Sequence, residues 1–213
     1  MQESSMDLKP YLSPTEFIES DAPAIKNLAE SLKRSGERET AVALFNWVRD
    51  EIRYDPFAAL DDREMYRATA ILERRRGYCV QKAVLLAALG RAAGIPCRLG
   101  FADVRNHKTP RHLLEIMGTN LYVFHGYVEL FLDCHIVNAT PPFDPDSTRK
   151  AGALLVELDG TNDAMLHPVD PQGHPFIEYV RYRGSFVDLP YDELQQAFLE
   201  TYASHSRLGP TRK

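Results

Sequence analysis

Cys79 and His125 are the residues of this sequence whose types and settings could do covalent chemistry. Cys79 stands where an apolar helix is expected to begin, and there the helix dipole and unpaired backbone N–H groups stabilise a thiolate and lower the pKa of the thiol. A thiol nucleophile also needs an imidazole within hydrogen-bond reach and a third group that orients the ring. Each residue alone would more often be an ordinary packed side chain. Together they predict a histidine-assisted thiol nucleophile.

The elements that carry this pair can be predicted from the spacing of apolar residues. A helix is expected to begin at Cys79 and to end at Gly94, before Ile95-Pro96. Alternation from Cys97 predicts a strand, and a second strand is expected from Leu121 to Leu132. One face of that second strand would hold His125, Tyr127, Glu129 and Phe131. Asp133-Cys134 predicts a hairpin turn that leads into a strand from His135.

The remaining segments are predicted to be mostly helical before Cys79 and mixed after the hairpin. A hydroxyl N-cap, a proline and a glutamate predict a short helix from Ser13, and apolar periodicity predicts helices that end near Ser35-Gly36 and Ile52. Residues 61–76 are expected to be a connecting region. Residues 175–182 are expected to form a strand and residues 190–202 a helix, followed by a polar tail after Ser204. Helices followed by an antiparallel sheet indicate an α+β fold.

Composition excludes several classes of protein. The chain has 213 residues, 44% of them hydrophobic and 26% charged, which is typical of one globular domain. A net charge of -5 without a basic excess argues against nucleic-acid binding. No apolar stretch approaches the roughly 20 residues that span a bilayer, and the first residues lack the features of a signal peptide. We therefore expect a cytoplasmic protein without a membrane or nucleic-acid partner.

Cysteine usage and histidine spacing argue against disulfides and metals. Three cysteines, Cys79, Cys97 and Cys134, are an odd number and predict free thiols. The sequence has no C-x-x-C pair, no H-x-x-x-H pair and no acidic loop of the calcium-binding type. We expect neither a metal nor another cofactor.

Three segments carry a resemblance to a known family. Residues 77–98 begin with Gly77-Tyr78-Cys79 and end in Gly94-Ile95-Pro96-Cys97-Arg98, which closely resembles the nucleophile helix of the transglutaminase-like superfamily. The segment His125-Gly126-Tyr127-Val128-Glu129-Leu130 is similar to the family's histidine strand, and residues 45–54 are similar to the helix that precedes the core. The resemblance covers about residues 11 to 145.

The resemblance implies a papain-like, transglutaminase-core fold in a single domain over residues 1–213. N-terminal helices would occupy 11–55, the catalytic core 56–145 and C-terminal strands and a helix 146–203, with a tail at 204–213. It also implies a cysteine peptidase, amidase or acyltransferase that acts on an amide of a peptide or protein. Cys79 would form a thioester and His125 would act as base and then acid, with Tyr54, Tyr78 and Tyr127 near the substrate. Hydrolysis is favoured over crosslinking.

The third catalytic group is where the sequence departs from the family. The family has an aspartate on the strand after the hairpin, whereas a two-residue turn at Asp133-Cys134 places Thr140 opposite Tyr127. Asp144, just beyond, and Thr140 are the favoured candidates, and Asn138 would take their place if the register shifted. A threonine orients an imidazole but does not stabilise its positive charge as a carboxylate does. The alternative function is therefore a catalytically weak or inactive peptide-binding module on the same fold.

Overall fold

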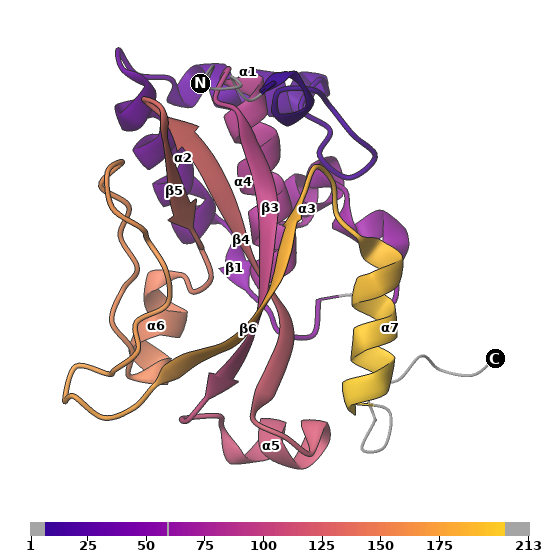
Figure 1. The fold of residues 1–213 in the computed structure, drawn as a ribbon, viewed down its shortest axis with the longest axis vertical. Helices are drawn as coiled ribbons and strands as arrows, with labels where there is room; N and C mark the ends of the chain where they lie inside the picture. The colour runs from indigo at the N-terminus through magenta and orange to yellow at the C-terminus, as the bar shows by residue number, and fades with distance from the viewer. Residues whose placement is uncertain (1–6, 59, 203–213) are drawn as a thin grey trace, which may run out of the picture.

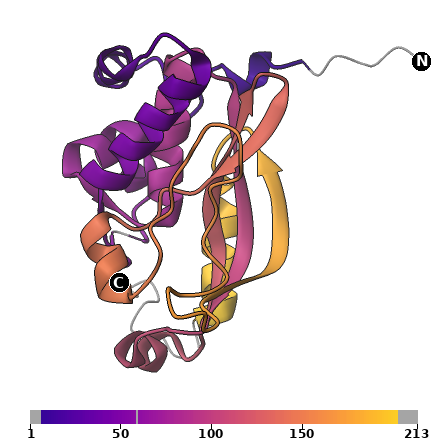
Figure 2. The ribbon, with the colours of Figure 1, turned by 90° about the vertical axis from the view of Figure 1, so that its left-hand side faces the viewer.

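A helical layer packs on one face of an antiparallel sheet in the computed structural model, which describes residues 7–58 and 60–202 (Figure 1, Figure 2). The sheet has the strand order β5-β4-β3-β6. Its strands are β3 (Cys97–Asn106), β4 (Leu121–Leu132), β5 (His135–Ala139) and β6 (Ile177–Phe186). The predicted α+β class is confirmed, and β4 has the bounds that the sequence predicts.

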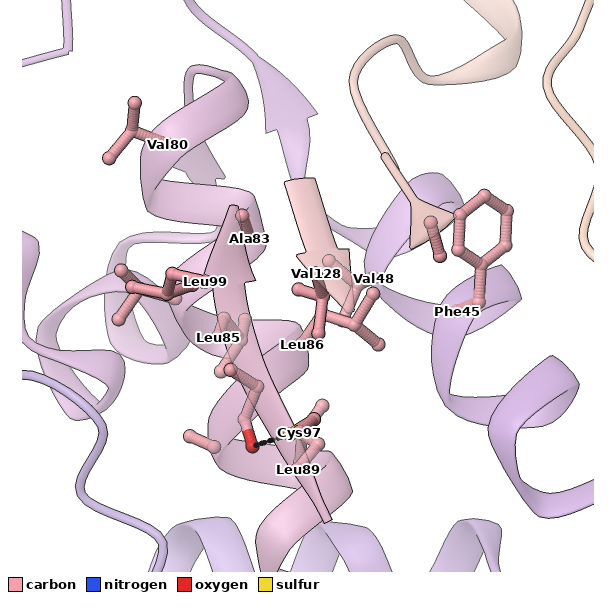
Figure 3. Packing of buried hydrophobic residues seen from close by; sticks show 14 of the residues in the cluster. Phe45, Val48, Val80, Ala83, Leu85, Leu86, Leu89, Cys97, Leu99 and Val128 are labelled. Carbon is pink, nitrogen blue, oxygen red and sulfur yellow. Dashed lines mark hydrogen bonds between the residues drawn. The ribbon is translucent and has the colours of Figure 1, made fainter. Parts of the chain in front are cut away.

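The helix that begins at Cys79 lies at the centre of the molecule. This helix, α4 (Cys79–Ala92), is buried along its whole length from Val80 to Arg91. It is covered by α1 (Pro23–Leu32), α2 (Glu37–Glu51) and α3 (Ala68–Arg74) on one side and by the sheet on the other. Figure 3 shows Leu86 and Leu89 of α4 in one buried cluster with Leu99 of β3 and Val128 of β4. Burial on all sides fixes the position of the first residue of α4.

The hairpin that follows β4 is formed as predicted. Asp133 and Cys134 both have positive φ, 47° and 67°, which is the backbone of a two-residue type I′ turn. The register pairs Val128 with Ala139 and Glu129 with Asn138. Thr140 therefore follows the last residue of β5 on the strand next to His125, as the turn predicted.

Short elements surround this core. Strands β1 (Arg53–Tyr54) and β2 (Arg76–Gly77) pair in parallel beside the start of α4. Helix α5 (Arg111–Met117) joins β3 to β4, α6 (Pro145–Ala151) follows β5, and α7 (Tyr191–Tyr202) follows β6. In Figure 1, α7 stands beside the sheet at the opposite side from α6. Within residues 7–58 and 60–202, no helix has the length and apolar character needed to cross a bilayer.

Two predictions of local structure are wrong. Residues 13–18 do not form a helix: they make an irregular segment with bends, in which Phe17 and Ile18 are buried and the N–H of Phe17 donates to Asp188. The preceding 3-10 helix, η1 (Lys9–Tyr11), is the only helix before α1 in the described residues.

Residues 61–76 are more than a connection, because they form η2 (Arg63–Tyr66) and α3. Asp62 caps η2, and a buried Ile71 anchors α3. The predicted tail, 204–213, lies outside the described residues.

Candidate active site

The start of α4 is held by a buried glutamine that the sequence analysis did not single out. Gln81 accepts a hydrogen bond from the backbone N–H of Tyr78 at 3.2 Å through its Oε1 atom. Its amide nitrogen donates to the carbonyl oxygens of Ala58 and Met65, at 3.1 and 3.0 Å. These bonds tie the first turn of α4 to the preceding loop. The signal in the sequence is a glutamine three residues after the N-cap residue Tyr78.

Gly126 lets the first turn of α4 approach β4 very closely. A β-carbon at this position would lie 2.9 Å from the Cα of Val80, a distance that real β-carbons essentially never show. Only glycine is therefore compatible with this contact. The close approach puts Cys79 beside the backbone of Gly126, and Cys79 and His125 line the same cavities. The backbone N–H of Gly126 acts on the thiol, since it lowers the pKa of Cys79.

His125 is buried in β4, and its ring is held by Thr140. The Nε2 atom of His125 lies 3.2 Å from Oγ1 of Thr140, which also donates to the carbonyl oxygen of Gly126 at 3.2 Å. Because the hydroxyl proton is directed to Gly126, Thr140 accepts a hydrogen bond from an N–H at Nε2. This tautomer leaves the lone pair on Nδ1, where it is free to take a proton.

A kink in β4 directly before His125 is a feature that sequence reasoning missed. Phe124 has a positive φ of 55°, and the β3–β4 register shifts between Ala102 and Val104. The N–H of Phe124 donates to the buried carboxylate of Asp103 at 3.1 Å. Arg183 of β6 donates to the same carboxylate and lies over the Phe124 ring, 4.5 Å from its centroid. Three strands thus hold the backbone that carries His125.

Asp144 and Asn138 are engaged elsewhere. Asp144 is the N-cap of α6, where it accepts hydrogen bonds from the backbone and hydroxyl of Ser147 at 2.9 and 2.7 Å. It also accepts the backbone N–H of Tyr54 at 2.9 Å. Asn138 bonds with Asp163 through its backbone and its amide. Of the three candidates, the structure joins Thr140 to the histidine.

The three tyrosines singled out in the sequence lie in different places. Tyr54 lines the cavity at Cys79 and packs edge-on against Phe143, with 4.7 Å between ring centroids. Tyr78 also lines it, with its hydroxyl 3.0 Å from that of Tyr66. The ring of Tyr127 lies over Gly100 of β3 instead.

Burial keeps the thiol and the imidazole neutral. It raises the pKa of Cys79 to about 11, although the backbone amides of Gly126, Val80 and Cys79 act in the opposite direction. It lowers the pKa of His125 to about 4. The expectation of a depressed thiol pKa is therefore wrong for this structure, because desolvation outweighs the helix N-terminus. At neutral pH the pair is thiol and imidazole, without a carboxylate to favour the ion pair.

Two cavities meet at Cys79 and His125. The larger, of about 980 Å³, is a mixed-charge groove that includes Arg53, Lys108 and Asp144. The smaller, of about 100 Å³, is mainly apolar and extends between β4, α5 and α7. Among the described residues, no group of three His, Cys, Asp or Glu side chains is placed to hold a metal ion. The arrangement suits attack by a thiol on an uncharged carbonyl group at the junction of the two cavities.

A cysteine at a helix start, beside a strand histidine held by the neighbouring strand, defines a thiol–imidazole site on an α+β core. A model of the Transglutaminase-like superfamily matches residues 26–141. The chain therefore belongs to the transglutaminase-like superfamily. The match contains Cys79, His125 and Thr140, and it ends before Asp144.

Comparisons with other proteins give only remote similarity. No curated protein matches the chain. It is similar at 18% identity to a solved "Putative Cysteine Protease" from Cytophaga hutchinsonii, over 84% of this chain and 54% of that one, with a TM-score of 0.47. It is similar at 19% identity to a solved TGase, over 58% of this chain and 31% of that one, with a TM-score of 0.39. The chain thus spans about half of the first of these and about a third of the second.

Proposed function

We propose that this protein is a cysteine-dependent enzyme that attacks an amide of a peptide or protein through a thioester on Cys79. The observation that carries the proposal is that Cys79 and His125 lie at the junction of the two cavities, with Thr140 hydrogen-bonded to the His125 ring. Thr140 holds the ring through Nε2 and leaves Nδ1 free to act as a base. Membership of the superfamily supports the same roles.

The reaction begins from the neutral pair. Nδ1 of His125 takes the thiol proton as Sγ of Cys79 bonds to the carbonyl carbon, and the carbonyl oxygen becomes an oxyanion. The backbone N–H of Cys79, in the first turn of α4, would stabilise that charge, because the first N–H groups of a helix have no partner within it. The oxyanion then collapses, the C–N bond breaks, and the leaving amine takes the proton from His125. The product is an acyl thioester on Cys79.

Hydrolysis of this thioester is the favoured second step. Water gives a proton to His125 and its oxygen to the acyl carbon, after which the C–S bond breaks and Cys79 regains its proton. The groove of about 980 Å³ supports access of water to the thioester. An amine in the same position would give transfer instead, because both reactions share the thioester.

Substitution of the nucleophile tests the proposal. We expect Cys79→Ala to abolish amide cleavage, measured as amine release from a library of peptides, and to leave the melting temperature within a few degrees of wild type. The matched control is Cys134→Ala, which removes an exposed cysteine from the hairpin turn and should keep full activity. Intact mass spectrometry should detect an acyl adduct on wild type and none on Cys79→Ala. Equal turnover in both variants would contradict the proposal.

A binding module is the second candidate, and one observation favours it. The pKa of Cys79 is raised to about 11 and that of His125 lowered to about 4, so proton transfer before attack is unfavourable. A binding module would hold peptides with equal affinity in wild type and Cys79→Ala and would release no amine. An enzyme shows burst or steady-state release that depends on Cys79.

A further inference from the structure

The small apolar cavity beside Cys79 has a wall outside the segment that the superfamily model matches. That wall is α7, residues 191–202, whereas the match covers residues 26–141. Phe198 and Leu199 of α7 line the cavity together with Leu113 and Met117 of α5 and Val123 of β4. The cavity therefore combines the thiol site with an element that lies outside the segment matched by the superfamily model.

Helix α7 is attached to the sheet at the level of the site. The hydroxyl of Tyr202 accepts the backbone N–H of Val123 at 2.9 Å and donates to the carbonyl oxygen of Leu121 at 3.1 Å. The amide nitrogen of Gln195 donates to the carbonyl oxygen of Leu60 at 2.7 Å. These bonds fix the wall at both ends of the cavity. Phe198 packs between Tyr78 and Tyr202, at ring-centroid distances of 6.4 and 5.7 Å.

Three polar side chains around this cavity are already engaged. The hydroxyls of Tyr78 and Tyr202 and the amide nitrogen of Gln195 bond within the protein. Asp61 is exposed and is the one carboxylate among the described lining residues. An acidic side chain placed inside would lose its hydration without gaining a cationic partner, and a basic one would find a carboxylate only at the exposed Asp61, so burying either is costly. An aliphatic side chain would gain from the transfer.

We propose that this cavity binds an aliphatic side chain, of the leucine class, on the residue whose carbonyl Cys79 attacks. The proposal rests on the proposed function. Because the cavity begins at Cys79, the side chain on the carbon next to the attacked carbonyl is the one that reaches it. A volume of about 100 Å³ suits one such side chain, since a cavity of about 150 Å³ accommodates benzene. The rest of the peptide would follow the polar groove.

Binding to a chemically inactive variant tests the cavity without requiring turnover. Three blocked tripeptide methylamides, which differ only in a C-terminal Leu, Asp or Lys residue, are titrated into Cys79→Ala by calorimetry. We expect the Leu peptide to bind roughly 10- to 100-fold more tightly than the other two. Equal affinities, tighter binding of a charged peptide or no binding of any of the three would overturn the proposal.

A pair of leucine substitutions of equal exposure locates the effect. Leu199 on α7 and Leu154 in a loop outside the cavity are each 39% exposed, so neither substitution empties a core position. In the Cys79→Ala background, Leu199→Glu should weaken binding of the Leu peptide and strengthen binding of the Lys peptide. The ratio of the two affinities should fall by about tenfold. Leu154→Glu should leave it unchanged. Identical behaviour of the two variants would overturn the assignment.

The outcome separates the cavity from the chemistry. A leucine preference in Cys79→Ala together with no amine release by wild type supports the cavity and contradicts the proposed enzyme. Amine release by wild type, without a leucine preference in the binding of peptides to Cys79→Ala, supports the proposed enzyme and contradicts the assignment of the cavity.

Discussion

Thr140 and Asp144 lie four positions apart and have opposite roles in this structure. Thr140 is fully buried at the end of β5 and is hydrogen-bonded to the ring of His125. Asp144 is also buried and lines the large groove together with His125, but its oxygens accept bonds from Ser147 and Tyr54. One side chain orients the candidate base, and the other joins α6 to β1.

This difference shows that nearness of a carboxylate in the sequence does not make it the partner of a histidine. A carboxylate has about four acceptor positions, and local N–H groups fill them first when the residue stands at a helix N-cap. The hydroxyl oxygen of Thr140, just after the adjacent strand β5, is not occupied by local N–H donors in this way. Strand register, rather than charge, therefore selects the group that reaches His125.

The largest expected effect is on stability, from Asp144→Ala. This substitution removes an N-cap and leaves the backbone N–H of Tyr54 without its partner, so we expect a loss of about 3 to 4 kcal/mol. Urea denaturation measures it. Asp146→Ala, in the first turn of the same helix but with a 71% exposed side chain, is the matched control and should lose less than about 1 kcal/mol. Equal losses would mean that Asp144 does not join the two elements.

Acid should weaken the folded state in a defined window because of His125. Its pKa is lowered from 6.5 to about 4, so between these values the unfolded chain binds more protons than the folded one. The free energy of unfolding is therefore not reduced by His125 above about pH 6.5. It falls by about 3 kcal/mol in total as the pH falls from there toward 4. Denaturation of wild type and His125→Gln at pH 7.5, 5.5 and 4.5 measures it. The variant should show a smaller decline over this range, and parallel declines would contradict the assigned pKa.

The fold could be predicted wherever a local rule and the apolar pattern agreed. The Asp133-Cys134 turn set the register that puts Thr140 beside His125, and apolar spacing located α4 and β4. Residues 13–18 were misjudged because good capping residues lost to the burial of Phe17 and Ile18. Helix propensity contributes less free energy than the burial of two large apolar side chains.

The site could be predicted only in part. Cys79 and His125 follow from residue type and motif, but the choice between Thr140 and Asp144 depends on long-range hydrogen bonds that no local pattern contains. The same is true of Asp103 and Arg183, which hold Phe124 from two other strands. Desolvation of the thiol is likewise a property of the packed site. It reversed the pKa direction that the helix N-terminus alone predicts.

The smallest expected effect, and the one specific to orientation, comes from Thr140→Val. Valine keeps the shape but removes the hydrogen bond to Nε2, so kcat/KM should fall roughly fivefold, as for the loss of about 1 kcal/mol. Thr140→Ser keeps the hydroxyl and should retain most of the activity. Thr140→Asp places a carboxylate beside the ring and should raise the pKa of His125 above about 4, as followed by NMR titration of the ring protons. If Val and Ser behave alike and Asp leaves that pKa unchanged, Thr140 does not orient the ring, and its bond to Gly126 is purely structural.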